Sequence, residues 1–191
     1  MAITTLNNRS INRSDTASSG QLWTATSATA SDFQAAAAGG KIGQVVQTVK
    51  TDTFTTTSTG SSFVDITGLT VDITPTATNS KILIFVDSMM TNADLKLINV
   101  RLVRDSTAIY IGDAASNRNR ATRTAYTHAT PEVYSYNATY LDSPSTTSAT
   151  TYKMQMVGES GTSGINYSGA DTDAAQWGRS ASSITVMEVL A

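Results

Sequence analysis

From Lys41 to the C-terminus, apolar residues recur at every second position in short runs, and turn residues separate these runs. Strict alternation of this kind is typical of β-strands that bury one face. The clearest runs are Leu69, Val71 and Ile73; Ile98, Val100 and Leu102; Tyr134, Tyr136, Ala138 and Tyr140; and Ile184, Val186, Glu188 and Leu190. Residues 41–191 show no helical periodicity, and strands do not alternate with helical patterns, which argues against a parallel sheet.

The expected fold class is all-β, as an antiparallel β-sandwich of jelly-roll type with an extended N-terminal arm and one short helix. Ser and Thr together make up 55 of the 191 residues, and β-branched Thr favours strands while Ser favours turns. The run from Lys81 to Met90 is apolar at odd and even positions alike. We therefore expect it to be a central strand, buried on both faces.

Residues 1–40 follow a different pattern, with few apolar residues among small and polar ones. Two interpretations remain open: a disordered tail, or an extended assembly arm that becomes ordered against partner chains. The arm is the prediction we carry forward, and its apolar anchors would be Ile11, Leu22, Trp23 and Phe33. Residues 31–40 combine a capping Ser or Asp, four alanines and a glycine stop, which predicts a short helix there. The expected domains are thus an arm at 1–40 and a sandwich at 41–191.

Composition excludes several functional classes. The chain has 13 Lys and Arg against 15 Asp and Glu, which leaves no basic surface for nucleic acid. It has no cysteine and one histidine, so we expect no disulfide, no metal site and no cofactor. No stretch approaches the roughly 18 apolar residues of a membrane span. The N-terminus lacks the pattern of a secretory signal, so we expect synthesis in a cytoplasm.

The chain also lacks a recognisable catalytic constellation. Asp65, Asp72 and Asp87 lie in or beside strand runs, but nothing marks two of them as a coupled acid pair. No Gly-x-Ser-x-Gly motif accompanies His128, so a Ser-His-Asp triad has no support. We therefore predict no catalytic residues and no enzymatic activity.

Three arginines, Arg118, Arg120 and Arg123, cluster within six positions. Guanidinium groups grip phosphates and carboxylates, so one interpretation is an anion site. The other interpretations are a solvated loop or a contact between subunits. Subunit contact is the functional role that we favour for them.

Residues 158–183 form a long, glycine-rich segment that we expect to be nearly without strands. Loops of this length in compact domains often carry function. The candidate contact residues for a host or partner are Tyr167, Asp171, Asp173, Trp177 and Arg179, because aromatic and arginine side chains are enriched at binding hot spots. The competing interpretations are that Trp177 turns inward to cover a sheet edge, or that the loop contacts another subunit.

Several strand-and-turn segments together resemble the small β-rich virion proteins of tailed bacteriophages, especially phages of aquatic bacteria. They are Lys41-Ile42-Gly43-Gln44-Val45-Val46-Gln47, the stretch from Phe63 to Pro75, Asn79-Ser80-Lys81-Ile82-Leu83-Ile84, and the closing Ile184-Thr185-Val186-Met187-Glu188. The resemblance covers about residues 41–110 and the C-terminus and includes no catalytic signature. It implies a homotrimeric β-sandwich fibre or decoration protein, located in the virion and without enzymatic activity.

Two functional hypotheses follow from this resemblance, and a third class competes with them. The first is a tail or head fibre that residues 1–40 attach to tail, baseplate or capsid proteins, with an exposed sandwich that contacts a host surface glycan or protein. The second is a capsid decoration protein that stabilises the head, with the arm as its clamp. A polysaccharide depolymerase is disfavoured because the acid pair is missing.

Overall fold

The computed structural model describes residues 21–25, 31–35, 41–129 and 132–190. The chain divides into two compact units, residues 1–39 and residues 40–191. In the first unit, β1 (Gln21–Ala25) pairs with β2 (Ser31–Ala35) as an antiparallel hairpin in which Trp23 lies opposite Phe33. The second unit contains all the remaining strands.

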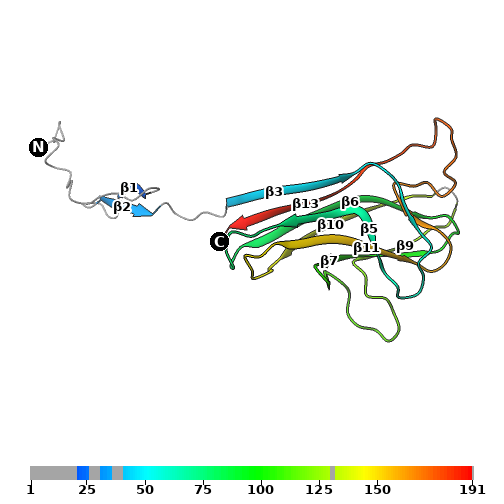
Figure 1. The fold of residues 1–191 in the computed structure, drawn as a ribbon, viewed down its shortest axis with the longest axis horizontal. Coiled ribbons are helices and arrows are strands. Elements are labelled where there is room, and N and C mark those ends of the chain that lie inside the picture. The colour runs from blue at the N-terminus through cyan, green and yellow to red at the C-terminus, as the bar shows by residue number, and fades with distance from the viewer. Residues whose placement is uncertain (1–20, 26–30, 36–40, 130–131, 191) are drawn as a thin grey trace, which may run out of the picture. The chain divides into compact units, whose positions relative to one another are not determined.

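The second unit is a sandwich of two antiparallel sheets whose strands run along its length (Figure 1). The six-stranded sheet contains β3 (Lys41–Lys50), β13 (Ser182–Leu190), β6 (Lys81–Asn92), β12 (Ser163–Ile165), β4 (Phe54–Thr56) and β10 (Tyr134–Asp142), the last paired with β6. The five-stranded sheet contains β5 (Val64–Ile73), β11 (Thr150–Gly158), β7 (Leu97–Arg104), β8 (Thr107–Ile109) and β9 (Arg123–Tyr126), the last paired with β7. The predicted antiparallel all-β sandwich is therefore confirmed.

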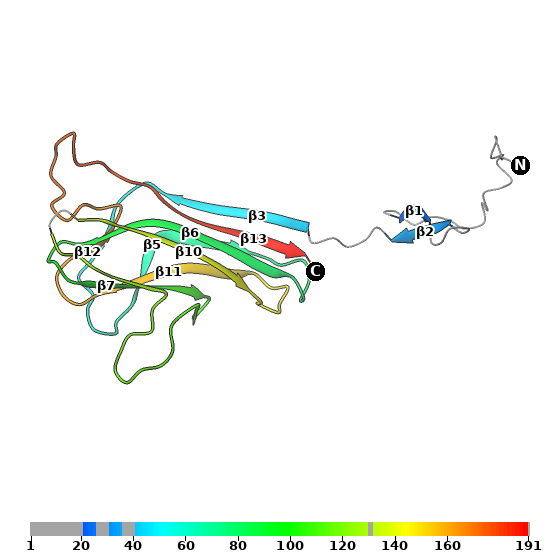
Figure 2. The ribbon, with the colours of Figure 1, turned by 180° about the vertical axis from the view of Figure 1, so that it is seen from behind.

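The core lies between the two sheets and is built from the alternating positions that the sequence marks as apolar. Side chains such as Ile84 and Ile184 from the six-stranded sheet meet Leu69, Leu102 and Met154 from the other, and each of these is at most 1% exposed. Burying a side chain of this size contributes about 1.5–3 kcal/mol, which explains why the period-2 pattern selects this architecture. Figure 2 shows the two layers from behind.

One sequence prediction about the long strands is wrong. The run from Lys81 to Met90 is not buried on both faces, because Phe85 is 38% exposed and points away from the core while Ile84 is buried. An antiparallel sheet can leave one face uncovered, and this one does. The segment between β11 and β13, predicted to be nearly without strands, contains only the three-residue strand β12, which is buried and pairs with both β4 and β6.

The prediction of a short helix at residues 31–40 is also wrong for the part of this segment that the structure describes. Residues Ser31–Ala35 form strand β2, and residues 36–40 lie outside the described residues. A helix this short is marginally stable on its own. The pairing of β2 with β1 therefore outweighs the helix propensity that the sequence indicates here.

The strand directions give the sandwich two distinct ends. At the proximal end, β3 begins at Lys41 and β13 ends at Leu190, beside the connections 74–80 and 143–149. At the distal end lie the connections 57–63, 93–96, 159–162 and 166–181. Residues that precede β3 therefore join the sandwich at the proximal end, opposite these distal loops.

A buried carboxylate, Glu188, ties the proximal end together. It is 0% exposed and accepts hydrogen bonds from Gln44 Nε2 at 2.9 Å, from the Thr76 backbone N–H at 2.6 Å and from Thr76 Oγ1 at 2.7 Å. Burial raises the pKa of Glu188, but these hydrogen bonds to the charged form outweigh burial and lower the pKa to about 2.

This lowered pKa predicts a specific acid sensitivity. A carboxyl whose pKa is lower in the folded state than its ordinary 4.5 stabilises the fold above that value, and its contribution is lost as pH falls toward about 2. We expect the free energy of unfolding, measured with denaturant between pH 5 and pH 2, to fall more gently in Glu188→Gln than in wild type. Gln44→Ala should show an intermediate slope. Equal slopes in wild type and Glu188→Gln would contradict this account.

Candidate functional site

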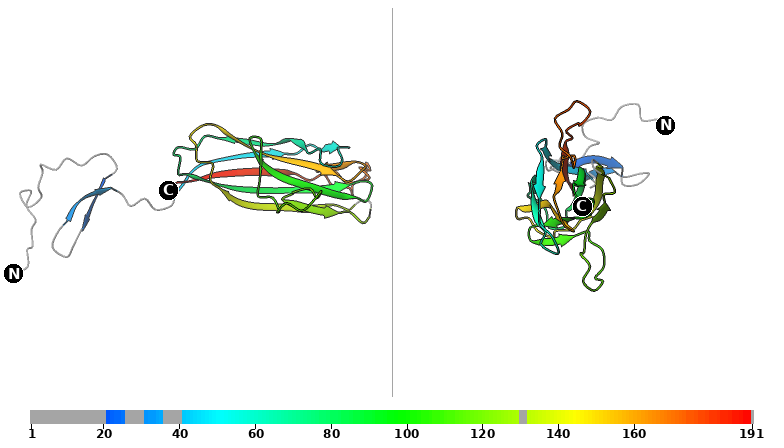
Figure 3. Two further views of the ribbon diagram at one scale, coloured as in Figure 1. Left: turned by 90° about the horizontal axis from the view of Figure 1, so that it is seen from below. Right: turned by 90° about the vertical axis from the view of Figure 1, so that its right-hand side faces the viewer.

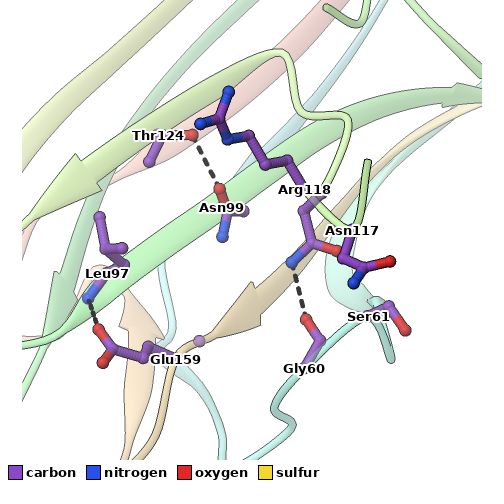
Figure 4. A pocket seen from close by; sticks show the side chains of 10 residues that line it. Gly60, Ser61, Leu97, Asn99, Asn117, Arg118, Thr124 and Glu159 are labelled. Atoms are coloured by element: carbon purple, nitrogen blue, oxygen red, sulfur yellow. Dashed lines mark hydrogen bonds between the residues drawn. The ribbon is translucent and has the colours of Figure 1, made fainter. Parts of the chain in front are cut away.

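A cleft of about 700 Å³, lined mainly by polar residues, lies near the distal end (Figure 4). We call it the amide cleft, and its lining residues are Gly60, Ser61, Leu97, Asn99, Asn117, Arg118, Asn119, Thr124, Gly158 and Glu159. They come from the connections 57–63 and 159–162, from β7, β9 and β11, and from the loop 110–122. The cleft therefore depends on segments that are far apart in the sequence.

The loop 110–122 forms one wall of the cleft because it interrupts pairing along β7. β8 pairs with the proximal part of β7 and β9 with its distal part, and the loop leaves the sheet between them. The loop is closed at its base by the Gly112 N–H bond to the Ala121 carbonyl oxygen at 3.2 Å. Its tip is held by Asn119 Nδ2, which donates to the Gly60 carbonyl oxygen at 2.7 Å.

The floor of the cleft is ordered by polar contacts that leave groups available for a ligand. Thr124 Oγ1 donates to Asn99 Oδ1 at 2.8 Å, and the Leu97 N–H donates to Glu159 Oε2 at 3.3 Å, as Figure 4 shows. Arg118 is exposed and lines the same cleft. Amides, a guanidinium and a carboxylate in one concave surface can donate and accept hydrogen bonds to a polyhydroxylated ligand.

A second, smaller depression of about 350 Å³, the aromatic pocket, lies at the distal end of the six-stranded sheet. It is lined by Met89, Val133, Asn166, Tyr167, Ser168, Gln176, Trp177, Gly178, Arg179 and Ser180. Tyr167 and Trp177 are half-buried, and Arg179 is exposed at the rim. Aromatic rings beside a guanidinium form the kind of surface that concentrates binding energy in a small area.

The loop 166–181, which carries most of this pocket, is anchored at its base by buried Asn166. Asn166 Nδ2 donates to the Lys50 carbonyl oxygen at 2.9 Å, and its Oδ1 accepts from Ser182 Oγ at 2.6 Å, so both ends of the loop are joined. Asn166 has a φ of 54°, a left-handed conformation that Asn tolerates better than most residues. Seen from the distal end in Figure 3, this loop and the loop 110–122 project from opposite sides of the sandwich.

The structure brings together most of the binding-loop residues predicted from the sequence. Tyr167, Trp177 and Arg179 line the aromatic pocket, and Asp171 pairs with Arg179 at 2.7 Å. Asp173 is exposed on the same loop but does not line the pocket. Trp177 lines the depression, as the ligand-binding interpretation expects, and it is also half-buried, as the inward-turned interpretation expects.

The three arginines predicted to form a subunit contact each have different neighbours in the structure. Arg118 lines the amide cleft, Arg120 Nε donates to the Gly112 carbonyl oxygen at 2.7 Å, and Arg123 lies on β9 with its guanidinium 5.7 Å from the Tyr110 ring. Their role in subunit contact stays a prediction.

Other predicted positions can be placed only in part. Leu22 and Trp23 lie on β1 and Phe33 on β2, whereas Ile11 lies outside the described residues. In the described part of the chain, no cluster of three or more His, Cys, Asp or Glu side chains could hold a metal ion. Within the same residues, no helix has the length and apolarity needed to cross a membrane.

Sequence reasoning missed the amide cleft and the anchoring role of Asn166. The signal available was weak: Asn117 and Asn119 flank Arg118 in a polar loop, and Glu159 opens the glycine-rich segment. Nothing local connects these residues with Gly60 or Asn99, because the cleft forms only when segments that are far apart in the sequence meet toward the distal end.

No family of known sequences matches this chain, and no curated protein is similar to it in sequence. Among solved structures, the chain is similar to infectious bursal virus derived T=1 particles, with a TM-score of 0.39, 10% identity and 88% of this chain covered. The Gx strain structure of infectious bursal disease virus has a TM-score of 0.35 and 14% identity over 85% of this chain. This chain spans only 40% and 43% of those two chains. At such TM-scores the likeness defines neither a shared function nor a shared assembly.

Proposed function

We propose that this chain is a non-enzymatic virion structural protein, a trimeric tail or head fibre of a bacteriophage whose distal end contacts the host surface. The sequence resemblance described above suggests the class of protein. The observation that carries the proposal is the polarity of the sandwich: the N-terminal segment joins it at one end, and both depressions lie toward the other. A chain anchored through its N-terminal segment would present these depressions outward.

The chemistry of the two depressions supports a host glycan as the ligand. A sugar ring has faces of C–H groups and a rim of hydroxyls. In the aromatic pocket, the rings of Tyr167 and Trp177 offer apolar surface for the faces. In the separate amide cleft, Arg118, Asn99 and Glu159 offer donors and acceptors for the hydroxyls of a second sugar unit. A proteinaceous receptor would use the same aromatic and arginine side chains.

Deletion of residues 1–39 tests the assignment of this segment to virion attachment. The truncated chain retains every strand of the two-sheet sandwich, so we expect it to fold with the circular dichroism spectrum of a β-protein. We also expect it to be absent from purified particles when it is the only copy supplied during infection. Normal incorporation of the truncated chain would contradict attachment through this segment.

Copy number and an enzyme assay test the rest of the proposal. A fibre should be present in few copies per particle and be needed for adsorption, whereas a decoration protein would be present in hundreds of copies and be needed for head stability. Densitometry of purified particles distinguishes the two. Release of reducing ends from host capsular polysaccharide by the purified chain would contradict a non-enzymatic role.

A further inference from the structure

The outer face of the six-stranded sheet carries an apolar row that runs across four neighbouring strands. Val45 on β3 pairs with Met187 on β13, Met187 pairs with Leu83 on β6, and Leu83 pairs with Leu141 on β10. We call these four residues the apolar row. Val45 is 53% exposed and Leu141 is 46% exposed, so the row lies open at both ends.

Further apolar side chains extend this row on the same face. Ile42, 51% exposed, pairs with Val189 on its proximal side, and Phe85, 38% exposed, lies one step toward the distal end. In the described part of these four strands, only Lys81 and Asp87 are charged residues on this face. Contiguous apolar surface of this kind on a soluble protein marks an interaction site.

The outer face of the other sheet has the opposite character. There Lys153 pairs with Asp65 at 2.8 Å, Gln155 Nε2 donates to Asp65 at 2.6 Å, and Arg101 Nε donates to Gln155 at 2.8 Å. A face covered by ion pairs and side-chain hydrogen bonds suits exposure to water. The contrast between the two outer faces indicates that the six-stranded sheet is the one that is covered.

We infer that the apolar row is the surface through which copies of this chain associate, a step that rests on the proposed function. All four residues of the row lie at one height along the strands. Copies related by an axis parallel to the strands would therefore place row against row. Such an arrangement also keeps all distal ends pointing in one direction, which a fibre attached by its N-terminal segments requires.

The size of the face is sufficient for a second copy. Four strands spaced about 4.8 Å apart and about nine residues long at about 3.3 Å per residue present roughly 570 Å² of flat surface. Two such faces would bury roughly 1,100 Å², above the roughly 1,000 Å² that distinguishes specific interfaces from incidental contacts. The few charges on the face give it no means of selecting a highly charged partner.

Light scattering coupled to size exclusion of the full chain tests this inference. We expect wild type to have the mass of three chains, as the proposed trimer requires. We expect Val45→Asp/Leu141→Asp to elute as one chain, with association weakened about 100-fold or more because carboxylates would be buried in the interface. Both side chains point away from the core, so the variant should keep its circular dichroism spectrum and melting cooperativity. Thr70→Asp, on the outer face of the other sheet, is the matched control and should retain the wild-type mass.

Two outcomes would overturn the inference. A monomeric wild type at all concentrations would mean that another protein covers the row, and an unchanged mass in Val45→Asp/Leu141→Asp would place association elsewhere. The second outcome leaves the proposed function intact, because copies would still associate. Failure of the proposed function is seen separately, as absence of the chain from purified particles.

Discussion

Replacing Asp142 with alanine is expected to lower the free energy of unfolding by about 3–5 kcal/mol, because the change leaves a partly buried guanidinium without its partner. Asp142 is 4% exposed at the proximal end of β10. Arg104 Nη1 donates to its two carboxylate oxygens at 3.0 and 2.8 Å, and Tyr152 Oη donates to Oδ2 at 2.7 Å. This contact links β10 of one sheet to β7 and β11 of the other.

The protonation of the two partners agrees with this arrangement. Burial lowers the pKa of Arg104, but the hydrogen bond and charge of Asp142 outweigh burial and raise it. Burial and the hydrogen bond to Asp142 both raise the pKa of the Tyr152 hydroxyl, which stays protonated as a donor. Arg104 thus keeps its charge and the Tyr152 hydroxyl its proton over the physiological pH range.

Denaturant unfolding at pH 7 measures the effect, and Asp72→Ala is the matched control. Asp72 is exposed on β5 and accepts one hydrogen bond, from Thr151 Oγ1 at 2.5 Å. Its loss should cost about 1 kcal/mol or less. Tyr152→Phe should fall between the two variants, since it removes one donor and keeps the ion pair. If Asp142→Ala and Asp72→Ala were equally stable, the inter-sheet contact would contribute nothing of note.

Replacing Trp177 with alanine is expected to weaken binding of the purified chain to host cells about 30-fold, the equivalent of about 2 kcal/mol for a hot-spot aromatic residue. The ring lines the aromatic pocket while remaining half-buried, so it can offer contact area to a ligand without a large ordering cost. Arg118→Ala, in the amide cleft, should weaken binding less, because an exposed arginine makes solvated hydrogen bonds.

Tyr110→Ala is the control variant, because it removes an aromatic side chain that lies away from the distal end. Tyr110 is 36% exposed and stacks on Tyr140 at a centroid distance of 4.9 Å, toward the proximal end. We expect binding of this variant to equal that of wild type in a titration of labelled chain on host cells. Equal losses in Tyr110→Ala and Trp177→Ala would indicate a general change in the fold, and full binding by Trp177→Ala would remove the aromatic pocket from the host contact.

The candidate binding residues could be predicted individually from the sequence, but their arrangement into a site could not. Tyr167, Trp177 and Arg179 stand close together in a glycine-rich segment, so the sequence pointed to them directly, and they do line one pocket. The aspartates were less predictable: Asp171 supports the loop through Arg179, and Asp173 does not line the pocket. The amide cleft escaped prediction because its contact between Asn119 and Gly60 joins residues with no local pattern in common.

The sequence alone determined that this chain forms an antiparallel sandwich and where most of its long strands lie, because alternation of apolar and polar residues is a local property that burial of one face enforces. Only the tertiary structure decided which face of the central strand β6 remains open, how short strands such as β12 complete the sheet, and which loops meet at the distal end. These features depend on register and on contacts between distant segments, and the energy that selects them appears only once the two sheets have packed.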